Sequence, residues 1–234
     1  MSEKTLRICH LYPDLLNLYG DRGNILCMRR RLEWRGIGAE VTEVTVGEQA
    51  DFTQFDLFFI GGGQDFEQEV LLSDLKAGKG GEIKAAIADG KTFLTICGGY
   101  QMLGSYYRTW DGKQCDFIGA IDYYTVGSKE RMIGNFLFEC LPESGGSTVV
   151  GFENHSGKTY LGSGVSPLGR TALRACVIKT FSVRTATARS CRKTPRFATI
   201  CSRRRCSSAI RSWNSSRWTM RPSSPRTTPC ATGC

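Results

Sequence analysis

A cysteine followed by two glycines stands where the sequence changes from a strand pattern to a helix pattern. The apolar, β-branched run at 93–96 is typical of a strand, and Cys97 and then Gly98-Gly99-Tyr100-Gln101 follow it. A side chain at such a bend points out of the carboxyl edge of a sheet, close to the amides of a helix N-terminus. A cysteine in a strand is more often a buried structural residue, but the two glycines allow a ligand to approach the backbone closely. The pattern predicts that Cys97 is a catalytic nucleophile.

A second glycine segment, Gly61-Gly62-Gly63, ends the preceding apolar run at 55–60. Its backbone amides are candidates to stabilise an oxyanion that forms beside Cys97. The Lys-Ser/Thr ending of a phosphate-binding loop is missing, so this is not a nucleotide site of that type. Taken alone, the segment is equally compatible with an ordinary glycine loop.

The segments around these residues alternate between strand and helix patterns. Strands are expected at 5–11, 39–46, 55–60 and 93–96, helices at 24–35, 66–75 and 82–89, and a loop at 78–81. This order predicts an α/β fold with a parallel, helix-covered sheet, whose sites form at the carboxyl ends of the strands. Later strand patterns at 116–124, 135–140 and 148–152 are expected to form an antiparallel extension.

Charge divides the chain of 234 residues into two parts. The net charge is +9, but residues 1–169 hold 16 basic and 22 acidic residues, while 170–234 hold 15 basic residues and no acidic one. We therefore expect a domain at 1–169 and a basic tail at 170–234 that is disordered or translated out of frame.

The N-terminal sequence has no signal-peptide pattern, and no apolar run approaches the roughly 18 residues that a membrane span needs. A cytoplasmic protein with reduced thiols is the expectation. The chain has no CxxC pair and no histidine cluster, so no metal site is expected.

Two motifs together resemble a known family. Ile60-Gly61-Gly62-Gly63-Gln64-Asp65, followed about thirty residues later by Ile96-Cys97-Gly98-Gly99-Tyr100-Gln101, is similar to the class I (triad-type) glutamine amidotransferases of the cobyric-acid-synthase-like branch. The segments at 12–24 (YPDLLNLYGDRGN), 131–135 (RMIGN) and 151–155 (GFENH) resemble one subfamily, the glutaminase subunits of lipid II isoglutaminyl synthases. The resemblance covers about residues 5–169 and implies a flavodoxin-like sheet with helices on both faces.

The resemblance implies a function and a set of site residues. Glutamine would be hydrolysed to glutamate, with Cys97 forming the γ-glutamyl thioester and amides near Gly63 and Gly98 stabilising the oxyanion. Arg131 matches a family arginine that binds substrate, and a guanidinium suits the α-carboxylate of glutamine. Gln101 would contact the substrate or support a residue that does. Without the resemblance, Arg131 would be interpreted as a solvated arginine.

The resemblance also implies a heterodimer with a Mur-ligase-like synthetase subunit. That partner would use ATP to amidate the D-glutamate of lipid II in peptidoglycan synthesis, with no cofactor on this chain and no nucleic acid bound. The alternatives are a corrinoid-amidating amidotransferase domain, a non-catalytic partner-binding module, or a nucleic-acid binder with a basic tail.

A histidine base is missing from the motifs. The chain has only His10 and His155, and the family's histidine lies in a Tyr-x-His-Gly-Pro-type segment that is absent. Combining the last base of each codon with the first two of the next lets residues 184–194 encode Tyr-Ser-His-Gly-Pro-Leu-Leu-Pro-Lys-Asn, with the histidine codon straddling Ala186 and Thr187. We hypothesise a frameshift near residue 170, which resequencing the locus would test, and expect very low glutaminase activity from the chain as written.

Overall fold

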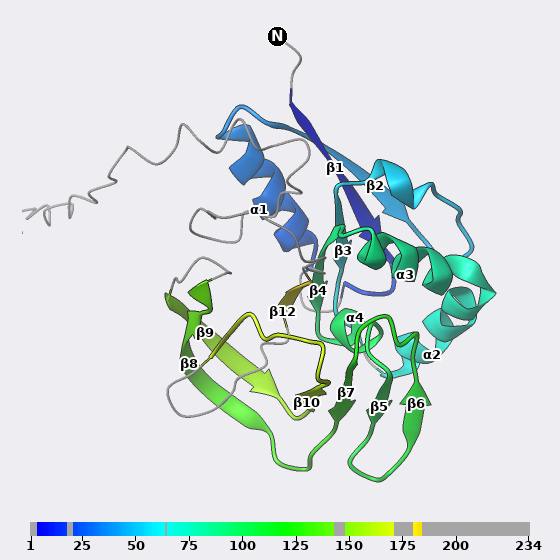
Figure 1. Cartoon of the computed structure of the whole chain (residues 1–234), viewed down its shortest axis with the longest axis vertical. Helices are drawn as coiled ribbons and strands as arrows, with labels where there is room; N and C mark the ends of the chain where they lie inside the picture. The colour runs from blue at the N-terminus through cyan, green and yellow to red at the C-terminus, as the bar shows by residue number, and fades with distance from the viewer. Residues whose placement is uncertain (1–3, 18–20, 64, 143–147, 171–179, 184–234) are drawn as a thin grey trace, which may run out of the picture.

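The centre of the computed structural model is a five-stranded sheet in the order β12-β4-β3-β1-β2 (Figure 1). The structure describes residues 4–17, 21–63, 65–142, 148–170 and 180–183. The strands of the central sheet are β1 (Thr5–Leu11), β2 (Gly38–Val44), β3 (Leu57–Ile60), β4 (Thr92–Ile96) and β12 (Thr180–Val183). β1 to β4 pair in parallel, and β12 runs antiparallel along the outer edge of β4.

The helical segments lie between these strands in the sequence. They are α1 (Arg22–Glu33), the short 3-10 helix η1 (Phe52–Gln54), α2 (Asp65–Asp74), the π-helical turn η2 (Leu75–Lys79), α3 (Gly80–Ala88) and α4 (Gly98–Gln101). None of the helices in the described ranges is long and apolar enough to cross a lipid bilayer.

Successive residues of a strand point to opposite faces of the sheet. Apolar clusters cover both faces of the central sheet, so both are buried. On one face, Leu6 and Ile8 of β1 pack with Ile25 of α1. On the other face, Leu11 belongs to the cluster that includes Ile83 of α3. Figure 1 shows α1 and α3 on opposite sides of the sheet. The predicted α/β fold class, with a parallel sheet and helices on both faces, is confirmed.

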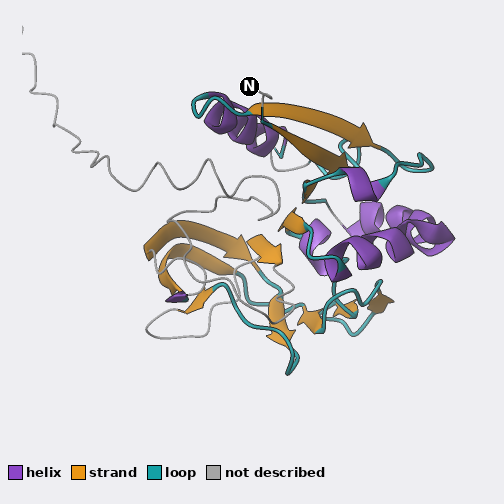
Figure 2. Cartoon of the chain, turned by 45° about the horizontal axis from the view of Figure 1, so that its top comes forward, coloured by secondary structure: helices purple, strands orange, loops and turns teal. Residues whose placement is uncertain are grey.

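The later strands form two smaller sheets of their own. One has the order β10-β7-β5-β6 and contains β5 (Tyr106–Arg108), β6 (Gln114–Asp116), β7 (Tyr123–Val126) and β10 (Lys158–Leu161). The other has the order β11-β8-β9 and contains β8 (Met132–Cys140), β9 (Thr148–His155) and β11 (Gly169–Arg170). Both lie in the lower part of Figure 2. The predicted antiparallel pairing is confirmed for β5–β6, β7–β10, β8–β9 and β8–β11, whereas β5–β7 is parallel. These strands do not extend the central sheet, because they form sheets separate from it.

The strand expected at 116–124 exists only at its ends. Between β6 and β7, the amide of Ile121 donates to the carbonyl of Leu103 at 3.0 Å, and that of Gly119 donates to Gly104 at 2.8 Å. The segment therefore wraps around the end of α4, and its hydrogen bonds go to that turn instead of to a neighbouring strand.

The loop expected at 78–81 is helical. The π-helical turn η2 runs directly into α3, with a break at Gly78, whose φ is 143°. Glycine adopts this backbone conformation without steric cost, so the chain kinks at Gly78 between two helical segments.

Only part of the predicted tail lies within the described residues. Arg170 belongs to β11, and Thr180–Val183 form β12, paired from Val183 with Phe93 to Thr180 with Ile96. The other positions of the predicted tail lie outside the described residues, so its predicted disorder and the boundary at 169 stay predictions.

Candidate active site

Cys97 has a backbone conformation that is rare for a residue with a side chain. Its φ is 47° and its ψ is −108°, at the point where β4 ends and α4 begins. Such a conformation costs about 1–3 kcal/mol and is typical of the sharp strand-to-helix turn that presents a nucleophile. The Cys97 thiol is half-buried and makes no hydrogen bond within the described part of the chain. The thiol is therefore held at a strained bend without being tied to a structural partner.

The start of α4 docks directly on the end of β3. The Gly99 amide donates to the carbonyl of Gly61 at 3.2 Å. A Cβ atom at Gly99 would lie 2.6 Å from Ile60 Cγ2, so a larger residue does not fit there. A Cβ atom at Gly61 would collide with the carbonyl oxygen of Leu16. The glycines of the two motifs are thus required by close backbone packing, which brings the glycine segment next to the cysteine.

The same contact decides which amides remain for an oxyanion. The Gly99 N–H is already used by Gly61, whereas the Gly98 N–H has no acceptor among the described residues. Gly63 is buried in the loop that follows β3, the neighbouring strand of β4. The Gly98 amide and the amides of this loop are therefore the candidate donors.

Gln101 lies one helical turn beyond the cysteine. The backbone N–H of Gln101 donates to the Cys97 carbonyl at 3.0 Å, and the residue is 6% exposed. The structure thus brings Cys97, Gly63 and Gln101 to the carboxyl edge of the central sheet, as predicted for their positions; their roles in chemistry stay predictions.

Arg131 lies elsewhere, just before β8 in the three-stranded sheet. Its side chain is exposed, and its Nε donates to Oδ1 of Asn154 at 2.5 Å. Met132 pairs with His155 in the same ladder, so two sequence motifs of the chain meet here. No hydrogen bond or ion pair in the described ranges joins Arg131 to the Cys97 turn, and its substrate-binding role stays a prediction.

Neither histidine reaches the Cys97 thiol within the described residues. The His155 ring nitrogens lie 3.1 Å from the Gly157 carbonyl and 3.1 Å from Glu153 Oε2. His10 is 1% exposed, and burial lowers the pKa of its imidazole, although Glu43 opposes this. Its Nε2 has no partner in the described structure. Among the described residues, the predicted nucleophile therefore has no histidine placed to act as its base.

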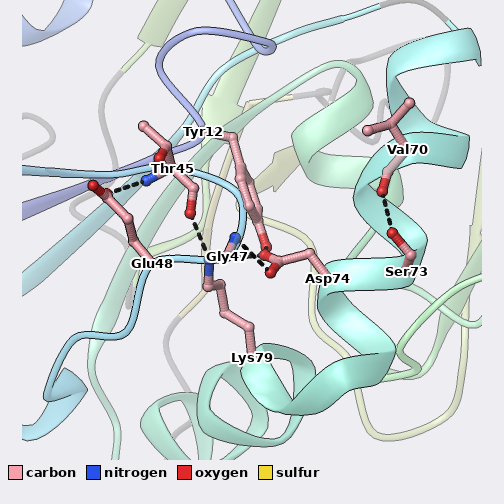
Figure 3. Close-up of polar contacts among 8 residues, drawn as sticks. All are labelled: Tyr12, Thr45, Gly47, Glu48, Val70, Ser73, Asp74 and Lys79. Carbon is pink, nitrogen blue, oxygen red and sulfur yellow. Dashed lines mark hydrogen bonds and ion pairs between the residues drawn. The ribbon is translucent and has the colours of Figure 1, made fainter.

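A buried polar cluster, which the sequence patterns did not reveal, lies at the same edge of the sheet (Figure 3). Lys79 Nζ lies 2.7 Å from Asp74 Oδ2 and donates to the Thr45 carbonyl at 2.7 Å. The Tyr12 hydroxyl donates to Asp74 Oδ2 at 2.8 Å, and the Gly47 amide donates to Oδ1 at 2.9 Å. Lysine is rarely buried, and a lysine in a glycine-rich stretch predicts a loop, so no sequence signal pointed to this cluster.

The cluster supports the loop beside the nucleophile. Tyr12 opens a turn in which the Leu16 amide donates to the Tyr12 carbonyl at 2.8 Å, and Leu16 in turn packs against Gly61. The contacts of Asp74 and Lys79 therefore join the turns after β1 and β2 to the end of α2, close to the glycine segment.

Replacing Lys79 by Met is expected to lower the free energy of unfolding by about 3 kcal/mol, because the Asp74 carboxylate then loses its buried counter-charge. Burial by itself would raise the pKa of Asp74, but hydrogen bonds from Lys79, Gly47 and Tyr12 outweigh it and lower the pKa. The contribution of the pair is thus complete above the unfolded pKa, about 3.9, and is lost as the pH falls through the lower folded value.

Urea denaturation at neutral pH measures this loss. Lys84→Met, at an exposed position of α3, is the matched control and is expected to change stability by no more than about 0.5 kcal/mol. Equal stability of the two variants would contradict a structural role for the Lys79–Asp74 pair.

The strained cysteine, the closely packed glycines and the parallel sheet are consistent with the family that a sequence comparison identifies. The family model of the CobB/CobQ-like glutamine amidotransferase domain matches residues 7–193. The chain belongs to this family. The match extends past residue 170, where the charge composition changes, and includes β12. The predicted membership of the glutamine amidotransferases is confirmed.

Two relatives of this glutamine amidotransferase domain share one name, lipid II isoglutaminyl synthase (glutamine-hydrolyzing) subunit GatD. The chain is 44% identical over 155 residues to the one from Staphylococcus aureus (strain N315) and 40% identical over 166 residues to the one from Streptococcus pneumoniae (strain ATCC BAA-255 / R6). These alignments cover 66% and 70% of this chain, but 62% and 63% of the relatives. The chain thus matches a little under two thirds of the length of each relative.

A solved structure supports the fold of the domain. PurLQS from Thermotoga maritima matches with a TM-score of 0.50, over 71% of this chain and 74% of that chain, at 16% sequence identity. At this identity the likeness supports the fold alone.

Proposed function

We propose that this chain is the glutamine-hydrolysing subunit of a lipid II isoglutaminyl synthase. The observation that carries the proposal is the strained Cys97 turn, packed on the glycine segment of β3, in a domain that is 44% identical to a subunit of that name. The predicted glutaminase activity, substrate and partner all follow from this proposal.

The geometry supports an acyl transfer through the cysteine. The Cys97 thiolate attacks the side-chain carbonyl carbon of glutamine, and the carbonyl oxygen becomes an oxyanion that accepts hydrogen bonds from the Gly98 amide and the loop at 61–63. The carbon–nitrogen bond then breaks, and the nitrogen leaves as ammonia after gaining a proton, which produces a γ-glutamyl thioester. Water attacks the thioester, releasing glutamate and restoring the thiol. One oxyanion donor typically contributes about 10²–10³ in rate.

The proton transfers need a base that the described residues do not supply. In the proposed reaction, a histidine takes the proton of the thiol and passes it to the leaving nitrogen. The segment encoded by the alternate reading frame supplies a candidate at the codon that straddles Ala186 and Thr187.

In the proposed complex, this chain works with a Mur-ligase-like synthetase in the cytoplasm. The synthetase binds ATP and activates the D-glutamate of lipid II, and this chain delivers ammonia without a cofactor of its own. Arg131 and Gln101 remain the proposed contacts to glutamine.

Transfer of the amide nitrogen tests the proposal. The chain, in the written and the alternate frame, is incubated with amide-¹⁵N-glutamine, ATP, a lipid II analogue and the synthetase subunit from the same genome. We expect the ¹⁵N label in the amidated stem peptide with the alternate-frame chain, and only when both subunits are present. Label in free ammonia but never in the peptide would contradict the assignment to lipid II, and no label in either would contradict glutamine hydrolysis.

A further inference from the structure

The first helix, α1, carries a concentration of positive charge that the rest of the domain lacks. Five of the 16 basic residues before position 170 lie between residues 22 and 35, together with only one of the 22 acidic residues. All five are exposed: Arg22, Arg29, Arg30, Arg31 and Arg35. The acidic residue is Glu33, which pairs with Arg30 at 2.6 Å. The rest of the chain before position 170 has 11 basic and 21 acidic residues, so positive charge is concentrated on α1 and the two residues that follow it.

The outward side of α1 combines two of these cations, Arg30 and Arg31, with exposed apolar groups. Ile25 is buried against the central sheet, so the residues near 180° from it on the helix point to solvent. Trp34, at the C-cap and nine positions after Ile25, lies on this outward side and is 75% exposed. Leu26 on the flank is 59% exposed. Figure 1 shows α1 on the far side of the sheet from α2 and α3. The helix therefore presents arginines, a tryptophan and a leucine together.

This combination distinguishes a lipid surface from other anionic partners. Arginines alone would suit any polyanion, but tryptophan is enriched where proteins meet the headgroup region of a bilayer, because its ring is apolar and its N–H is polar. A double-stranded nucleic acid offers phosphates without an apolar layer for Trp34 and Leu26 to enter. The negative remainder of the domain is repelled by an anionic surface, which orients α1 toward it.

We propose that the exposed face of α1 docks this chain on an anionic phospholipid surface, with Arg30 and Arg31 on the headgroups and Trp34 in the interfacial layer. The docking is peripheral, since a helix of 12 residues lies on a bilayer and does not cross it. It is independent of glutamine hydrolysis, so either property can be present without the other.

Sedimentation of the full chain with phosphatidylglycerol–phosphatidylcholine vesicles tests the docking. The double variant Arg30→Gln with Arg31→Gln is expected to lower the partition constant about 25-fold, since each cation near an anionic surface contributes about fivefold. The matched control is Lys76→Gln with Lys84→Gln, which removes the same charge from exposed positions of η2 and α3 and is expected to bind like the parent. Urea denaturation confirms that both variants fold.

The tail at 170–234 is also basic, so a second variant separates its contribution to vesicle binding from that of α1. Arg203→Gln with Arg204→Gln removes two tail charges and is expected to leave most of the binding. Brominated lipids are expected to quench the parent's fluorescence, and Trp34→Phe is expected to remove most of that quenching. Loss of binding in the tail variant but not in the α1 variant would overturn the proposal. The proposal would also be overturned if the parent chain did not sediment with the vesicles, even if it bound duplex DNA through the same arginines.

Discussion

Replacing residues 170–234 by the sequence of the alternate reading frame is expected to raise the glutaminase rate by about 10²–10⁴-fold, the usual contribution of a general acid–base. The physical reason is the position of the two histidines in the described structure. His155 is engaged by Gly157 and Glu153, and His10 is buried within the sheet. Neither is placed to take the Cys97 proton, whereas the alternate frame supplies a histidine in the family's motif.

A coupled assay for glutamate measures this rate in both chains. The control is the alternate-frame chain with its new histidine replaced by glutamine, which keeps the restored segment but not the base. We expect this control to fall back toward the rate of the chain as written. A high rate from the chain as written, or an unchanged rate in the histidine control, would show that the base lies elsewhere.

A glutamine chloroketone is expected to alkylate the alternate-frame chain at a single cysteine, and Cys97→Ser is expected to abolish this labelling completely. The electrophile occupies the glutamine site and places its reactive carbon where the amide carbon would lie, so it selects the thiol that faces the substrate. Cys97 is held at that point by the strained turn between β4 and α4. Intact-protein mass spectrometry counts the adducts.

The other cysteines provide the controls for this experiment. Burial raises the pKa of the Cys9 thiol to about 12, although Lys79 partly opposes it, so Cys9 is expected to stay unreactive. Cys27 is exposed on α1, and Cys27→Ser is expected to label as the parent does. Free glutamine should protect Cys97. Labelling that persists in Cys97→Ser, or that glutamine does not slow, would contradict a nucleophilic role for this cysteine.

The local order of the fold was predictable because it depends on side-chain periodicity. Apolar runs such as Leu57–Ile60 are buried on both faces, and they were recognisable as strands of a parallel sheet without any long-range information. The position of Cys97 after such a run was sufficient to predict a thiol at the carboxyl edge of the sheet. The positive φ of the cysteine agrees with that prediction.

Other features depend on contacts between distant segments, and the sequence patterns predicted them poorly. The segment between β6 and β7 looked like a strand, but its amides bond to the turn that follows α4. Lys79 lies in a stretch that resembled a glycine loop, yet its side chain is buried beside Asp74 and Tyr12. Tyr12 and Asp74 are hydrogen-bonded although 62 positions separate them in the sequence. A partner at that distance does not affect the local periodicity of side chains, so the pattern could not predict it.

By itself, the sequence determined the fold class, the family motifs and the absence of the family's histidine segment, and it predicted the nucleophile at Cys97. These depend on residue types and short spacings, which the chain carries locally. Only the tertiary structure decided that Gly99 donates its amide to Gly61 and leaves that of Gly98 for an oxyanion. It also decided that Arg131 bonds to Asn154 and that Trp34 lies on the exposed side of α1, near Arg30 and Arg31. Packing between separate segments determines these features, because a backbone contact or an exposed face exists only once the neighbouring elements are in place.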